Sequence, residues 1–318
     1  MNPKVLIVGT LPETAGIGGV TIHIERLLQW INKDTIIVDL CDYKALSIFV
    51  QTKKIMQYSI IHIHASHPAL RLFYVCISRL LNKKTILTIH GDIGRFSFVK
   101  NWLDKLAIKI CTVPIVINST SFNKAIKWNK KTLQMSAFIP PLEEGTIPNK
   151  ALYQITEAKN KNKTIYCTNA SIRSFNKNGE EIYGIEFLVD YFQKQSDSCL
   201  IVSDPSGEYS KLYKNNIKNT IFISTPHSFY AVIKHADALI RATATDGDSI
   251  SIKEGLFLNK KVIATDRVPR PNGVILYQYN DIESFKNALN YSADIKENNF
   301  KENTIEKINK LYNTLVSQ

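Results

Sequence analysis

Short runs of apolar residues alternate with helix-like patterns along nearly the whole sequence, and this alternation restricts the fold more than any other feature. In the first half the predicted strands are Val5–Val8, Ile36–Leu40, Ile60–His64, Thr85–His90 and Pro114–Asn118. Strands that alternate with helices pair in parallel through right-handed crossovers. Because the strands are apolar on both faces, we expect helices to cover both faces of the sheet.

The alternation stops at Ile139-Pro-Pro-Leu142 and the polar segment 143–150, because two prolines fit neither a helix interior nor a central strand. It resumes with predicted strands at Thr164–Cys167, Cys199–Val202, Thr220–Ile223, Ala238–Arg241 and Lys261–Ala264. A chain of 318 residues is long enough for two cores. We therefore predict an α/β protein of two doubly wound, Rossmann-like domains, residues 1–145 and 146–318, that face a central cleft.

The cysteines and the apolar stretches bear on the compartment. Five cysteines are scattered singly without CxxC spacing, which favours free thiols in a reducing compartment. The sequence enters a predicted strand directly, and its longest apolar helical stretch, 70–81, carries Arg71 and Arg79. Neither a signal peptide nor a membrane-spanning segment is expected, so we predict a cytoplasmic protein.

The net charge of +12 is concentrated in the first half. Residues 1–150 contain 19 Lys and Arg against 9 Asp and Glu (+10), and residues 151–318 contain 21 against 19 (+2). A basic domain indicates an acidic partner, which could be a nucleic acid, an anionic membrane or a phosphorylated substrate. The charge alone does not choose among these partners.

A glycine-rich loop follows the first predicted strand, and a predicted helix starts after it. Open α/β sheets bind ligands at the carboxyl ends of their strands. Gly18 and Gly19 would let the backbone approach an anion at the start of that helix. A glycine-rich turn without a ligand is the alternative. The spacing differs from the GxGxxG pattern of dinucleotide-binding proteins.

Histidines end two strands of the first half. His62 and His64 close the third strand, and His90 follows the fourth strand directly before Gly91-Asp92. We predict that His90 lies in the cleft, with His64 as a weaker candidate. A metal site is the less favoured alternative, because the spacing lacks the HExxH and facial-triad patterns.

An acidic loop near the end of the chain is the strongest motif. A buried strand ends at Arg241, and Asp246 and Glu254 follow eight residues apart, the first on a loop and the second on a helix. Carboxylates bind sugar and ribose hydroxyls well because each oxygen accepts two hydrogen bonds. Backbone N–H groups of residues 247–251 could hold a phosphate. An ordinary capped surface helix is the alternative.

In the order of these motifs, the sequence resembles the retaining glycosyltransferases of family 4, which have the GT-B fold. The likeness rests on Gly18-Gly19, Ile60-Ile-His-Ile-His64, Thr88-Ile-His90-Gly91, Ala238-Leu-Ile-Arg241, Asp246-x7-Glu254-Gly255 and Lys261-Val-Ile-Ala-Thr265. It implies transfer of a sugar from a nucleotide-diphosphate sugar with retained configuration. It also implies that no metal or cofactor is needed, since the nucleotide sugar is a substrate.

The resemblance also assigns roles to residues. Glu254 would bind the ribose, Asp246 the transferred sugar, and His90 would lie beside the anomeric carbon. In the resembled fold the last helix, about 303–316, crosses back to the first domain. The implied donor-binding residues are Gly18, Gly19, Arg173, Lys177, Gly247, Asp248, Ser249, Ile250, Ser251 and Arg270. The implied acceptor-side residues are His64, Asp92 and Arg95.

The sequence departs from the family pattern at three places. Asp246 stands where Glu is usual. The family's diphosphate-binding Arg corresponds to Arg173, but its Lys is replaced by Tyr183, so Lys177 is an alternative cation. Many members have a glycine-rich turn after the last core strand, where this sequence has Arg267-Val-Pro-Arg270-Pro-Asn-Gly273, so Arg270 is a further alternative cation. Asp246-Gly-Asp248 also matches the DxD motif of the metal-dependent GT-A transferases, which is a further alternative.

The acceptor is predicted from the resemblance and from the basic first half. Segment Arg95–Lys109 combines three aromatic residues with four cations, and it could lie on an anionic bilayer or pack as an ordinary amphipathic helix. We expect a UDP- or GDP-sugar donor and a glycan or undecaprenyl-diphosphate-linked acceptor in bacterial capsule, O-antigen or exopolysaccharide synthesis. A nucleic-acid-binding protein, for which no motif is found, or a non-catalytic sugar-binding protein are the alternative functions.

Overall fold

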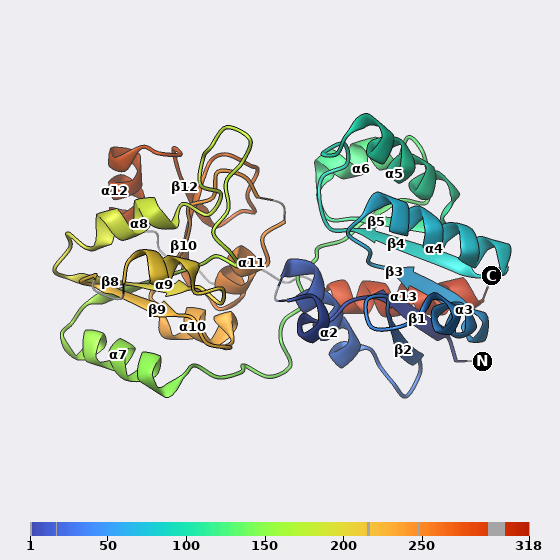
Figure 1. Ribbon diagram of the computed structural model, residues 1–318, viewed down its shortest axis with the longest axis horizontal. Coiled ribbons are helices and arrows are strands. Elements are labelled where there is room, and N and C mark those ends of the chain that lie inside the picture. Colours follow the sequence, from blue (N-terminus) through green and yellow to red (C-terminus); the bar gives the residue numbers. More distant parts are fainter. Residues whose placement is uncertain (1, 17, 215–216, 247, 292–302, 318) are drawn as a thin grey trace. The chain divides into compact units, whose positions relative to one another are not determined.

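The computed structural model describes residues 2–16, 18–214, 217–246, 248–291 and 303–317. The chain forms two compact units, Met1–Leu142 with Glu302–Gln318 and Glu143–Lys301. The division falls a few residues before the boundary predicted at 145. The last helix therefore belongs to unit 1, although the sequence that precedes it belongs to unit 2 (Figure 1).

Unit 1 contains one parallel sheet in the order β2-β1-β3-β4-β5-β6. Its strands are β1 (Lys4–Gly9), β2 (Ile37–Asp42), β3 (Ile60–Ile63), β4 (Lys84–Ile89), β5 (Val113–Val116) and β6 (Leu133–Gln134). Its helices are α1 (Pro12–Ala15), α2 (Gly19–Trp30), α3 (Ile48–Gln57), α4 (Pro68–Leu80), α5 (Phe98–Ile110), α6 (Ser119–Ala125) and α13 (Thr304–Val316).

Both faces of this sheet are buried, as its apolar strands predict. In β1, Leu6 packs with α3 to α6 on one face, and Val5 packs with α2 and α13 on the other. Successive strand residues point to opposite faces, so an all-apolar strand needs cover on both sides. Residues of α13, among them Ile308 and Leu315, complete the second cover.

A buried hydrogen-bonded pair fastens α13 to the sheet. The Tyr312 hydroxyl lies 2.6 Å from Nδ1 of His62 on β3, and Nε2 of His62 lies 2.8 Å from the Thr88 hydroxyl on β4. Burial, and secondarily His23, lowers the pKa of His62 to about 3. His62 is thus a neutral core residue whose two ring nitrogens are both bonded.

Unit 2 contains a second parallel sheet in the order β12-β11-β10-β7-β8-β9. Its strands are β7 (Thr164–Asn169), β8 (Ser198–Ser203), β9 (Thr220–Ile223), β10 (Ala238–Arg241), β11 (Lys261–Thr265) and β12 (Val274–Tyr277). Its helices are α7 (Asn149–Asn160), α8 (Ile185–Phe192), α9 (Glu208–Leu212), α10 (Phe229–His235), α11 (Ile250–Phe257) and α12 (Ile282–Asn290). Helices α7, α10 and α11 pack on one face, and α8, α9 and α12 on the other.

Two strands and four helices were not predicted from the sequence: β6, β12, α1, α3, α7 and α9. β6 and β12 are the outermost strands of their sheets. β6 spans two residues and β12 is only partly buried, so neither has a strong apolar pattern. All five cysteines are unpaired. Among the described residues, no helix is both long enough and apolar enough to cross a membrane.

We predict that Tyr312→Phe lowers the stability of unit 1 by about 1–3 kcal/mol, because it leaves a buried ring nitrogen of His62 without its partner. All three tryptophans, Trp30, Trp102 and Trp128, lie in unit 1, so urea denaturation followed by tryptophan fluorescence reports on this unit. Thr314→Val is the matched control, since it removes an exposed hydroxyl from the same helix. Equal stability of the two variants would show that the pair does not hold α13.

Candidate functional site

The strand order of unit 1 creates a switch point between β1 and β3. From β1 the chain crosses by α2 to β2 on one side, and from β2 it crosses by α3 to β3 on the other. Helix α2 follows β1 and helix α4 follows β3, and they lie on opposite faces of the sheet, so the loops diverge at the carboxyl ends of β1 and β3. Ligands of doubly wound sheets bind at such a point.

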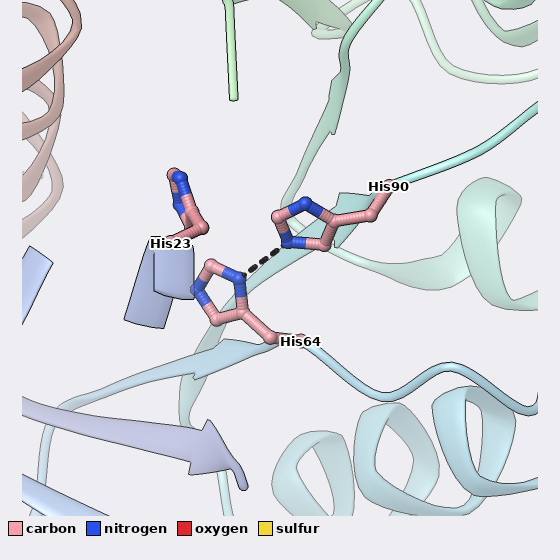
Figure 2. Close-up of side chains that lie close together, drawn as sticks. All are labelled: His23, His64 and His90. Atoms are coloured by element: carbon pink, nitrogen blue, oxygen red, sulfur yellow. Dashed lines mark hydrogen bonds between the residues drawn. The ribbon is translucent and has the colours of Figure 1, made fainter. Parts of the chain in front are cut away.

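Three histidines meet at this edge (Figure 2). His64 directly follows β3, His90 directly follows β4, and His23 lies on α2. Nδ1 of His64 and Nε2 of His90 form a hydrogen bond of 2.9 Å. The His23 ring centre lies 5.3 Å from that of His64 and 4.9 Å from that of His90.

Burial keeps the His64 and His90 rings of this cluster neutral. It lowers the pKa of His64 and of His90 well below the ordinary value, and the neighbouring histidines lower both further. Arg71 and Arg95 add to the effect on His90. Near neutral pH, His90 can therefore donate or accept one hydrogen bond but carries no charge to offer a leaving group.

Sequence reasoning missed His23. The sequence feature that could have identified it is its position four residues after Gly19, about one helical turn into α2. This position places the His23 side chain at the carboxyl edge of the sheet. Nδ1 of His23 lies 2.7 Å from the Ala137 carbonyl oxygen, which can only accept, so Nδ1 carries a proton and donates.

The cluster has the chemistry to hold a metal ion. Ligand nitrogens of His23, His64 and His90 lie within 4.8 Å of one another, and neutral imidazole is a common ligand of transition metals. Nε2 of His64 is buried and has no hydrogen-bond partner among the described residues. The direct bond between His64 and His90 is the competing arrangement, because it occupies one nitrogen of each ring.

The other predicted residues of unit 1 lie at the same edge. Gly18 is the N-cap of α2, and its amide donates to the Thr21 hydroxyl. A Cβ at Gly18 would meet no atom of the described residues within 4 Å beyond its chain neighbours. Gly19 is the first residue of α2. Asp92 is exposed and accepts a hydrogen bond from Asn118 at 2.8 Å. The exposed Arg95 extends its guanidinium over Gly91, where a Cβ would clash with it.

Unit 2 has its own switch point, between β7 and β10, and an arginine bridges it. Arg241 ends β10, and its Nη1 donates to the carbonyl and side-chain oxygens of Asn169, which ends β7, at 2.9 and 3.1 Å. The Tyr183 ring lies 5.3 Å from the guanidinium. The two strands that diverge at the switch point are thus joined at their carboxyl ends.

Asp246 lies between two arginines at this edge. Its Oδ2 accepts from Nε of Arg241 at 3.1 Å and from Nη1 of Arg270 at 3.0 Å. Burial raises the pKa of the Asp246 carboxyl, but Arg241 and Arg270 together lower it more, so the net pKa is below the ordinary value. The side chain of Arg270 is 2% exposed and also donates to the Thr243 hydroxyl. Arg270 therefore braces Asp246 in this structure.

The remaining residues of the motif lie around the start of α11. Asp248 forms an ion pair of 2.5 Å with Lys253, and the hydroxyls of Ser249 and Ser251 lie 3.1 Å apart. Ser249 is the N-cap, yet its side chain does not bond back to the first turn of α11, which begins at Ile250. Glu254, on the same helix, is buried. Gly247 lies outside the described residues.

The candidate cations of the second domain differ in their surroundings. Arg173 is partly exposed and binds Glu186, with Nη2 2.7 Å from the carboxylate, and this hydrogen bond raises the pKa of Arg173. Lys177 is exposed on a hairpin closed by the Phe175–Glu181 bridge. Glu181 accepts from the amides of Ile185 and Glu186, so a carboxylate already occupies the N-terminus of α8. The start of α11 is therefore the better phosphate site of the two.

No protein-family model matches the sequence, and no curated protein matches it. Solved structures match over nearly the whole chain. Anabaena HepE in complex with UDP has a TM-score of 0.71 at 13% identity, covering 99% of this chain and 100% of its own. Sucrose-phosphate synthase from Thermosynechococcus elongatus has a TM-score of 0.69 at 13% identity, covering 99% of this chain and 100% of its own. UDP-GlcNAc 2-epimerase from Methanocaldococcus jannaschii has a TM-score of 0.58 at 12% identity, covering 98% of this chain and 99% of its own.

These likenesses and the two six-stranded parallel sheets establish a GT-B fold. The GT-A alternative for Asp246-Gly-Asp248 is therefore wrong. A physical reason agrees with the fold: Asp246 is paired with two arginines and Asp248 with Lys253, so both carboxylates already have cationic partners. Because one fold hosts several reactions, the activity has to be inferred from the residues.

We predict that Gly184→Ala destabilises unit 2 more than Gly179→Ala. Both glycines have positive φ, of 65° and 75°, but only at Gly184 would a Cβ clash, 2.2 Å from the Ala242 carbonyl oxygen. The shared backbone strain is about 1 kcal/mol, and the clash should add roughly 1–3 kcal/mol. Calorimetry measures the stability of unit 2. Since unit 2 has no tryptophan, its unfolding transition is the one that tryptophan fluorescence does not report. Equal losses would mean that the backbone yields at Gly184.

We also predict that unit 1 loses stability as the pH falls below about 6.5. His62, His64 and His90 have pKa values lowered in the folded state, so the unfolded chain binds protons first. Each histidine contributes up to about 1.4 kcal/mol per pH unit in this window. Urea denaturation by tryptophan fluorescence between about pH 7 and 5 measures the slope. His64→Asn should reduce the slope by one proton, and an unchanged slope would contradict a neutral His64.

Proposed function

We propose that this protein is a glycosyltransferase that moves a sugar from a UDP-sugar onto a glycan or lipid-linked acceptor. The arrangement of Arg241, Asp246 and Arg270 at the switch point of unit 2 carries the proposal. It presents the charged carboxylate of Asp246 beside the start of α11. There the sugar of a nucleotide-diphosphate sugar would find a hydrogen-bond acceptor, and the diphosphate would find backbone N–H donors. The bound UDP of HepE, a protein of the same fold, favours uridine over guanosine as the base.

In this proposal α11 binds the leaving nucleotide. The first amides of a helix have no partner within it, so those of Ile250 and Ser251 suit a diphosphate. Glu254 would accept hydrogen bonds from the ribose hydroxyls. Arg173 and Lys177 are the cations proposed to meet the charge that develops as the bond to the diphosphate breaks.

Asp246 would bind the hydroxyls of the transferred sugar. Its lowered pKa keeps it ionised, so both oxygens act as acceptors. The two arginines fix the orientation of a side chain one methylene shorter than the usual Glu. Arg270 would act on the donor through Asp246 and not by direct contact with the diphosphate.

His90 is proposed to lie beside the anomeric carbon on the acceptor side, with His64, Asp92 and Arg95. Its neutral ring can hydrogen-bond to the sugar without adding positive charge to an oxocarbenium-like transition state. We propose transfer of a hexose with retention, as in family 4, and without a metal ion. Paired cations at Asp246 and Asp248 support the metal-free part, because the negative charge of the motif is already balanced.

The acceptor and the cellular setting follow from charge and resemblance. The excess of +10 in residues 1–150 suits an acceptor such as undecaprenyl-diphosphate-linked sugar at an anionic membrane surface. We propose a cytoplasmic enzyme of bacterial capsule, O-antigen or exopolysaccharide synthesis, peripheral on the inner face of the membrane.

The test is thermal unfolding with UDP, UDP-sugars, GDP and GDP-sugars, each with and without EDTA. At a ligand concentration about a hundredfold above its Kd, we expect stabilisation by roughly 2.7 kcal/mol with the uridine ligands, EDTA having no effect. Glu254→Gln should abolish the shift, because an amide replaces an acceptor-only carboxylate at the ribose. Glu283→Gln, at an exposed glutamate of α12, is the control.

The other outcomes separate the alternatives. Stabilisation by guanosine ligands alone would change the donor, and loss of the shift with EDTA would contradict metal independence and direct attention to the three histidines. Donor binding without transfer to any acceptor would favour a non-catalytic sugar-binding protein. Stabilisation by oligonucleotides and by no nucleotide would contradict the proposal.

A further inference from the structure

We propose that the N-terminal half of α5 is a membrane-docking surface that inserts into an anionic bilayer. The apolar side chains that begin this helix point into solvent and not into the core. Phe98 is 87% exposed, Val99 64% and Trp102 55%. In contrast, the buried residues of α5 lie in its second half, at Asp104, Ala107 and Ile108. The helix thus anchors to the sheet by one end and exposes aromatic side chains at the other.

The exposed charged side chains within segment 95–109 are all positive. Segment 95–109 contains a single acidic residue, Asp104. Asp104 is buried and binds Nη1 of Arg71 through both carboxylate oxygens, at 2.9 and 3.0 Å. The exposed cations Lys100, Lys105 and Lys109 therefore have no acidic neighbour on their own helix.

The spacing places cations and aromatics on one stripe. Phe98, Trp102, Lys105 and Lys109 recur at helical intervals of four, three and four residues. Aromatic rings that enter the headgroup region, flanked by lysines that pair with lipid phosphates, are the chemistry of interfacial helices. A second copy of this chain is a poorer occupant, because it would bring the same lysines together.

A second exposed apolar tip lies at the same edge of the sheet. Helix α3 follows β2 as α5 follows β4, so both helices start at the carboxyl ends of parallel strands. Ile48 and Phe49 at the start of α3 are 55% and 65% exposed, and Nζ of Lys53 lies 4.5 Å from the Phe49 ring centre. The histidine cluster occupies this edge too. A bilayer at this edge would hold a lipid-linked acceptor near His90, so the surface deepens the proposed function.

The experiment is co-sedimentation of the full chain with phosphatidylcholine vesicles that contain or lack phosphatidylglycerol. We expect binding to the anionic vesicles only, weakened by salt. Each lysine removed, as in Lys105→Gln and Lys109→Gln, should weaken binding about fivefold. The double variant Phe98→Ser/Trp102→Ser should lose at least about tenfold. Tyr153→Ser, at a 66% exposed aromatic of α7, should bind unchanged.

A variant with Trp30→Phe and Trp128→Phe retains Trp102 as its single tryptophan, whose emission should shift to the blue on anionic vesicles. Absence of this shift, or equal binding of the double variant and the parent, would overturn the proposal. So would self-association by light scattering that the double variant abolishes, since it would assign the surface to a second copy. Vesicle binding needs no nucleotide, so stabilisation of the double variant by UDP shows separately whether the donor proposal holds.

Discussion

Both units depend on a parallel sheet that is covered by helices on both faces. Such a sheet buries a polar side chain within its layers only where that side chain finds partners, as His62 does, so the candidate residues collect where the strands end. The strand order then selects one place along that edge. Helices leave β1 and β3, or β7 and β10, on opposite faces of the sheet, so a gap opens between the neighbouring loops. His64 and Arg241 follow or end strands at these two positions, and the candidate residues of each unit gather around them.

The two edges are electrostatically different. In unit 1, burial keeps His64 and His90 neutral, and the two rings share a hydrogen bond. In unit 2, the buried carboxylate of Asp246 stays charged because two arginines compensate its desolvation. A neutral edge suits the approach of a hydroxyl nucleophile, and a charged, preorganised edge suits the binding of a sugar and the departure of a diphosphate. This division of tasks is what the proposed transfer needs.

Much of the fold could be predicted because the informative strands are central and apolar on both faces. The edge strands β6 and β12 and the helices α1, α3, α7 and α9 escaped prediction, because these elements are short, half-exposed or weakly apolar and their patterns are faint. For the site, the strand-end rule identified His64, His90 and the loop around Asp246. The same rule did not identify His23, because His23 lies on helix α2 and not at a strand end. It reaches the cluster because it lies about one helical turn after the start of α2.

The sequence by itself determined the α/β class, the two cores and the edge at which chemistry would occur, since these follow from hydrophobic periodicity and parallel pairing. Only the tertiary structure decided which side chains are bound to which. The position of Arg270 against Asp246, 24 residues away in sequence, and of Asp104 against Arg71 depends on loops whose conformation has no periodic pattern. Burial makes these pairings matter, because a charge removed from water must find a partner, and which partner is close is a property of the packed chain.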